Sequence, residues 1–114
     1  MFKKIHILAA LALALSSCAM GSFTRTGNNY PALAEDARVD VVMRSKPDYK
    51  YEVIGMAEVK GGTLEMQLDK ARAIARENGG DVIIIVETGT NYQVTGDQLN
   101  SYDVRVFEVA RRIR

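Results

Sequence analysis

Residues 61–87 read GGTLEMQLDKARAIARENGGDVIIIVE, and this stretch decides the fold class. Leucine and alanine recur at helical spacing over residues 64–75, Thr63 can cap the N-terminus of a helix, and two consecutive glycines can end it. Residues 82–86 are β-branched without alternation, which is typical of a strand buried on both faces. The stretch therefore predicts an amphipathic helix packed on a sheet.

Further strands are predicted on both sides of this unit. Their pattern is apolar and β-rich over residues 39–43, 49–60 and 101–110, and residues 92–95 could start a further strand, with turn signals at 45–48, 88–91 and 96–98. The alternation slips near Gly55, as a β-bulge or a close backbone approach requires. We expect one α+β domain over residues 38–114, with the order ββαββ and one helix packed on a small mixed sheet.

The N-terminus has the composition of a secretory signal peptide. Lys3 and Lys4 precede a nine-residue apolar run at residues 7–15. A helix that spans a bilayer needs roughly 20 apolar residues, so this run is too short to cross the membrane. We expect residues 1–17 to be a cleaved signal.

Leu15-Ser16-Ser17-Cys18 resembles the lipobox of bacterial lipoproteins. The resemblance implies cleavage between Ser17 and Cys18, diacylglycerol on the Cys18 sulfur and a further acyl chain, such as palmitate, on the new amino terminus. Several acyl chains anchor a protein stably where one does not. Ala19 after the cysteine implies the outer membrane, with the domain facing the periplasm. The alternative is ordinary cleavage after Ala19, which leaves a periplasmic protein without a lipid.

Removal of the signal leaves a chain with few reactive side chains. The only histidine, His6, is lost, and removing Lys3 and Lys4 from 15 basic residues leaves 13 against 14 acidic ones. Without histidine or a free thiol, catalytic triads, imidazole acid–base chemistry and ordinary zinc sites are excluded. A near-neutral charge argues against nucleic acid as a partner. We expect no enzymatic activity, no cofactor and no metal.

Residues 18–37 are small and polar without a sustained period, so we expect a lipidated N-terminus followed by a flexible tether. Such a tether would hold the domain roughly 20 to 25 Å from the lipid. Phe23, Tyr30 and Leu33 are exceptions, and they could either pack on the domain or serve a partner. Packing on the domain is the expected outcome.

Residues 51–55, YEVIG, and residues 71–83, ARAIARENGGDVI, together resemble a pattern of small envelope lipoproteins. The pattern is similar to that of DUF4156-type lipoproteins and of the outer-membrane sensor of the Rcs phosphorelay, with YbjQ-like domains as more distant relatives. The resemblance implies an envelope compartment and an α+β fold, and it transfers no active-site residue. Two departures are Gly80, where these families tend to have alanine, and the absence of the sensor's disulfides.

Three groups of residues have a functional alternative to an ordinary structural role, and we expect the structural role for each. Residues 61–63 could bind an anion, but we expect a tight turn. Calcium could be bound by Asp36, Asp40, Asp97 and Asp103, but we expect solvated charges. Residues 111–114 could contact anionic lipid, but we expect a solvated chain end.

Two function classes remain for a domain of this kind. The first is a non-catalytic envelope lipoprotein that presents the domain to an unknown envelope protein. The second is a binding module for a small periplasmic ligand or an envelope polymer, with contacts from Tyr49, Tyr51, Tyr92 and Tyr102. Tyrosines gathered on a concave face would favour the second class, and an open sheet edge would favour the first. A homo-oligomer is a further hypothesis, because so small a domain has little core of its own.

Overall fold

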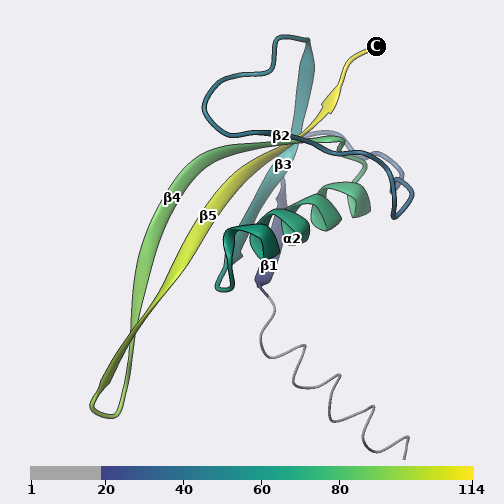
Figure 1. The fold of residues 1–114 in the computed structure, drawn as a ribbon. Coiled ribbons are helices and arrows are strands. Elements are labelled where there is room, and N and C mark those ends of the chain that lie inside the picture. The colour runs from purple at the N-terminus through teal and green to yellow at the C-terminus, as the bar shows by residue number, and fades with distance from the viewer. Residues whose placement is uncertain (1–18) are drawn as a thin grey trace, which may run out of the picture.

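The computed structural model describes residues 19–114, so the predicted signal peptide, its cleavage site and Cys18 lie outside the described residues. One helix packs on a five-stranded mixed sheet whose strand order is β1-β3-β5-β4-β2 (Figure 1). The elements are β1 (Met20–Arg25), β2 (Asp40–Val42), β3 (Tyr51–Lys60), α2 (Leu64–Glu77), β4 (Val82–Thr95) and β5 (Gln98–Arg112). The predicted α+β class with one helix is confirmed.

Strand directions follow from the connections. β2 pairs with β4 in parallel, and the other three pairings are antiparallel. Since β5 lies between β3 and β4 and is antiparallel to both, β3 and β4 run parallel and α2 crosses between them. The chain therefore needs the long helical crossover that the sequence predicts.

The helix begins and ends where its capping residues predict. The Thr63 hydroxyl accepts a hydrogen bond from the Met66 backbone N–H at 3.2 Å, and Gly79 follows the helix with a φ of 84°. Only glycine adopts that positive φ without strain. The helix is therefore fixed at both ends by local sequence.

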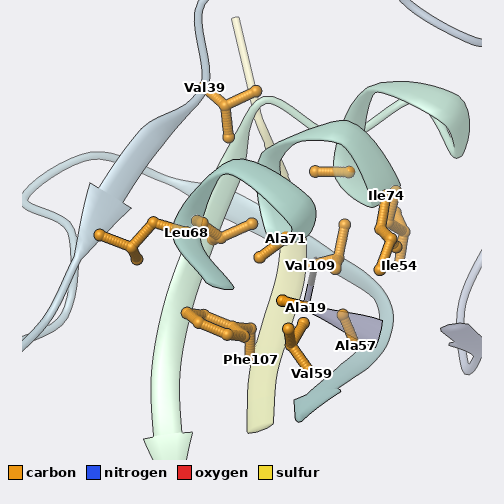
Figure 2. Close-up of a cluster of buried hydrophobic side chains, with 12 residues drawn as sticks. Ala19, Val39, Ile54, Ala57, Val59, Leu68, Ala71, Ile74, Phe107 and Val109 are labelled. Atoms are coloured by element: carbon orange, nitrogen blue, oxygen red, sulfur yellow. The ribbon is translucent and has the colours of Figure 1, made fainter. Parts of the chain in front are cut away.

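The main core lies between α2 and the sheet (Figure 2). Leu68, Ala71 and Ile74 project from the helix onto buried side chains of the three central strands. These include Ile54, Ala57 and Val59 of β3, Ile83 of β4, and Phe107 and Val109 of β5. A smaller cluster on the opposite face contains Val82, Ile84 and Ala110. The prediction that the strand at 82–86 is buried on both faces is therefore confirmed for residues 82–84.

The predicted tether at residues 18–37 is wrong where the structure describes it. Ala19 is buried, and Met20–Arg25 form β1, which pairs with β3. The phenyl ring of Phe23 occupies the space over Gly55, where an added Cβ would lie 2.3 Å from a ring carbon. The sequence does not predict this strand because its residues are mostly small and polar, and Phe23 is its only aromatic residue. The folded domain therefore includes the residues from Ala19 onward, and the element order over residues 19–114 is βββαββ, not ββαββ.

The rest of the predicted tether also packs on the domain. Phe23 and Tyr30 pack against the core, which confirms that expectation for these two residues. Leu33 remains exposed, but its backbone N–H donates to the carbonyl of Arg76 at 2.7 Å. The Arg76 guanidinium in turn donates to the carbonyl of Ala37. The segment is therefore held to the end of α2 by hydrogen bonds to its backbone N–H and carbonyl groups. Such bonds cannot be predicted from amino-acid composition.

The predicted turn at residues 88–91 is also wrong. β4 continues through Gly89 and Asn91 to Thr95, and the chain reverses at Gly96 and Asp97. Threonine, tyrosine and valine around these two residues favour a strand, and pairing with β5 satisfies the backbone. The predicted strand at residues 82–86 and the segment at 92–95 that could start another therefore belong to one strand, β4.

Candidate functional site

A two-stranded arm extends beyond the body of the sheet (Figure 1). β2 stops pairing with β4 at Ile84, and β3 stops pairing with β5 at Val104. From there residues 90–95 pair only with residues 98–103, across the turn at Gly96. We call residues 90–103 the arm. At about 3.3 Å per residue the six ladder pairs give it a length of roughly 20 Å.

Both edges of the arm are open within residues 19–114. The outer edge of β4 pairs with no strand of the described chain beyond Ile84, and the outer edge of β5 pairs with none before Val104. Residues 88–96, TGTNYQVTG, and 98–102, QLNSY, contain no charge and no proline. Natural edge strands are commonly protected by lysine, proline or a covering loop. This arm carries none of these within its strands, so its backbone groups can pair with an added strand.

One face of the arm tip is apolar. Val94 and Leu99 lie directly opposite each other, and Tyr92 lies two residues before Val94 on the same face. Their exposed fractions are 72%, 66% and 66%, respectively. Exposed apolar groups of this kind mark interaction sites when they gather on one surface. We call these three residues the tip patch.

The base of the arm is fixed to α2 by a fully buried polar side chain. The Gln67 amide nitrogen donates to the carbonyls of Gly61 and Asp103 at 2.9 and 3.0 Å, and its oxygen accepts from the Arg105 guanidinium. No buried side-chain nitrogen or oxygen of residues 19–114 lacks a partner. The helix therefore positions the strand from which the arm departs.

The four candidate tyrosines do not gather on one face. Tyr49 and Tyr51 pack on the small cluster of Val82, Ile84 and Ala110. Tyr51 lies opposite Arg112, whereas Tyr92 lies opposite Ser101, eleven residues earlier and roughly 35 Å away along β5. Tyr102 lies opposite Asn91, one ladder position from the Tyr92 pair, so it belongs to the other face of the arm.

Tyr49 is held by charged neighbours. Its hydroxyl donates to Asp40 at 2.9 Å, and the Arg112 guanidinium lies 4.4 Å from the centre of its ring. Burial and the hydrogen bond to the Asp40 carboxylate raise the pKa of Tyr49 from 10.0 to about 12. These contacts hold Tyr49 in the fold.

Sequence reasoning missed a polar cluster on the N-terminal segment. The Glu52 carboxylate accepts hydrogen bonds from the Tyr30 hydroxyl and the Asn28 amide, and the Arg111 guanidinium lies 3.8 Å from the centre of the Tyr30 ring. The hydrogen bond from Tyr30, then that from Asn28, lowers the pKa of Glu52 below its ordinary 4.5. A tyrosine within a polar segment is the only sequence signal for this cluster.

The other candidate groups have structural partners. Gly61 and Thr63 accept hydrogen bonds from Gln67 and Met66, as a turn and a helix cap do. Asp40 accepts from Tyr49 and Arg38, and no three potential metal ligands come together within residues 19–114. Arg111 and Arg112 stack on tyrosine rings, and the Ile113 N–H donates to the carbonyl of Lys50. The C-terminus is therefore docked up to residue 113.

Over the described part of the chain, no helix combines the length and hydropathy needed to cross a membrane. No protein family matches the chain, and no curated protein is similar enough to count as a relative. Among solved structures, the chain is similar to the orthorhombic crystal form of a Francisella virulence factor, FvfA. The TM-score is 0.53 at 17% identity, over 83% of this chain and 99% of that chain. Similarity at this identity shows the fold alone.

Proposed function

We propose that this protein is an envelope lipoprotein, anchored through Cys18 in the outer membrane, whose non-catalytic domain binds a protein partner through the β4–β5 arm. The observation that carries the proposal is the arm itself. Its two strands leave the sheet with open edges that carry no lysine, arginine or proline, so an extended segment of a partner can add to them by main-chain hydrogen bonds. A sensor, an assembly factor or an accessory subunit would each use such an edge.

The fold and the compartment motif support this proposal together. The lipobox-like Leu15-Ser16-Ser17-Cys18 directly precedes Ala19, which is buried. The α+β fold fits the resemblance to DUF4156-type and Rcs-type lipoproteins that we draw from the sequence.

The alternative is a binding module for a small ligand, and the geometry gives it less support. A surface hollow of about 700 Å³ is lined by residues of β2 and of the chain on either side of it, between Arg38 and Tyr49, and by Arg72. Of the four candidate tyrosines only Tyr49 reaches it. The tyrosine cluster that this alternative requires is not formed.

Lipidation is tested by mass spectrometry of the mature protein from the native envelope. We expect the N-terminal peptide to begin at Cys18 and to carry a diacylglyceryl group and a further acyl chain. A Cys18→Ser variant should no longer partition with membranes. A mature N-terminus after Ala19, without lipid, would contradict the anchor.

The arm is tested by photocrosslinking in the native envelope. A crosslinking amino acid at Asn91, in the middle of the exposed β4 edge, should capture a protein partner. The same amino acid at Glu77, which is exposed at the end of α2, is the control. Thr90→Lys places a charge on the edge and should abolish the adduct, whereas Ala32→Lys on an exposed loop should not. An equal adduct from both positions would contradict a binding role for the arm.

A further inference from the structure

We propose that the tip patch of Tyr92, Val94 and Leu99 contacts the same lipid surface that holds the anchor. This inference rests on the proposed lipidation of Cys18. It adds a second membrane contact, made by a face of the arm, and it leaves the open edges for the protein partner.

The arm and the start of β1 lie at the same end of the sheet (Figure 1). Met20 pairs with Lys60, and Lys60 pairs with Val104, the residue that directly follows the arm in β5. From Val104 the strand continues five residues to Leu99, or roughly 17 Å. The tip patch therefore lies beyond Met20, in the direction from which the chain enters the domain.

The anchor leaves no spacer between the lipid and the sheet. Ala19 is buried and Met20 is already paired with β3, so the lipidated residue lies one Cα step, about 3.8 Å, from a fixed part of the fold. A lipid on Cys18 therefore brings this end of the sheet to the bilayer surface. An arm that extends roughly 17 Å past the same end must then lie along that surface or enter it.

The composition of the arm favours a shallow contact in the interfacial layer. Tyrosine, valine and leucine are favourable there, since the tyrosine ring is apolar and its hydroxyl stays hydrated. Asp97, in the turn, carries a charge that would be costly in the acyl region, so it keeps the tip among the headgroups. Residues 88–104 contain no lysine or arginine. The contact is therefore apolar, and it requires neither anionic lipid nor low salt.

The experiment uses single tryptophans in the lipidated protein, because the chain has no tryptophan of its own. Leu99→Trp places the probe in the tip patch, and Ile113→Trp places it on an exposed apolar residue at the opposite end of β5. The proteins are reconstituted in phosphatidylcholine vesicles with brominated acyl chains. We expect the emission of the Trp at position 99 to shift to the blue and to be quenched by the brominated lipid. Both effects should be unchanged at about 0.5 M salt. Emission at position 113 should show neither effect.

Two results would overturn the inference while leaving the anchor intact. One is emission at position 99 that matches that at position 113. The other is a blue shift without bromolipid quenching, which would show that the tip is covered by protein or by a second copy of the chain. Mass spectrometry of the same preparation shows whether Cys18 carries the lipid, and this distinguishes failure of the tip-patch inference from failure of the proposed anchor. Lipid on Cys18 without quenching at position 99 defeats only the inference, whereas absence of the lipid defeats both.

Discussion

Gln67 connects the helix, the turn before it and the base of the arm. It is fully buried, and both ends of its amide are hydrogen bonded, to the carbonyls of Gly61 and Asp103 and to Arg105. A buried amide is stable only when its donors and acceptors are satisfied. The sequence placed Gln67 on the helix but gave no sign of its burial, because the periodicity of apolar residues does not distinguish a buried polar side chain from an exposed one.

Replacing Gln67 with leucine should destabilise the domain. The substitution leaves the Gly61 carbonyl and the Arg105 guanidinium without this partner, and an unsatisfied buried group costs about 1–3 kcal/mol. We expect urea denaturation to give a free energy of unfolding lower by this amount. Gln98→Leu makes the same change at an exposed position of β5 and should have little effect. Equal effects of the two substitutions would show that the hydrogen bonds of Gln67 do not matter.

Glu52 should make the free energy of unfolding decrease as the pH falls into the acid range. Its folded-state pKa is lowered by hydrogen bonds from Tyr30 and Asn28, so its charged form is favoured in the folded state. This contribution is complete above the pKa of an unfolded glutamate and is lost as pH falls through the lower folded pKa. Between about pH 6 and about pH 3, the wild type should therefore lose more stability than Glu52→Gln.

Carboxyl NMR titration of Tyr30→Phe should show a higher Glu52 pKa than in the wild type, and an unchanged value would contradict the role of this hydroxyl.

At the scale of elements, strand β1 depends on the missing side chain of Gly55. A Cβ there would lie 2.3 Å from the Phe23 ring and 2.6 Å from the Thr24 carbonyl, so Gly55→Ala should displace β1 from β3. Overpacking of this kind typically costs about 1–3 kcal/mol. Hydrogen exchange of residues 20–25 should become faster. Gly89→Ala is the matched control, since no atom lies within 4 Å of its added Cβ, and it should leave exchange in β1 unchanged. Protected β1 amides in Gly55→Ala would contradict this dependence.

The elements that sequence predicted are those that local residues specify. The helix follows from its cap, its apolar stripe and its terminal glycines, and the irregularity near Gly55 follows from a slip in alternation, seen as the register shift between Val53 and Gly55. β1 and the middle of β4 could not be predicted, since each depends on a partner strand distant in sequence. The arm was missed for the same reason. Its glycine and asparagine favour a turn locally, and only pairing with β5 makes them a strand.

At the scale of the whole molecule, the arm lies outside both clusters of buried side chains. The buried cluster between α2 and the sheet uses β5 at Phe107 and Val109, and the most N-terminal β5 residue in either buried cluster is Phe107. The arm contributes no side chain to these clusters, and its apolar residues Tyr92, Val94 and Leu99 are exposed. Exposed apolar side chains that gather outside the core are typical of interaction sites. The fold is therefore a compact base that carries a protruding arm, and this is the arrangement on which the proposed binding role rests.

Shortening the arm tests this separation. Replacing residues 92–101 with Asn-Gly joins Asn91 to Tyr102, which already face each other, through a turn suited to a two-residue hairpin. Because no core residue is removed, the free energy of unfolding should change by under about 1 kcal/mol. Phe107→Ala, on the same strand but in the core, should cost about 3–5 kcal/mol. The shortened protein should remain membrane-bound through Cys18 yet lose the protein adduct at position 91. A loss of stability comparable to that of Phe107→Ala would show that the arm belongs to the folded core, and its proposed role in binding would then lack its structural basis.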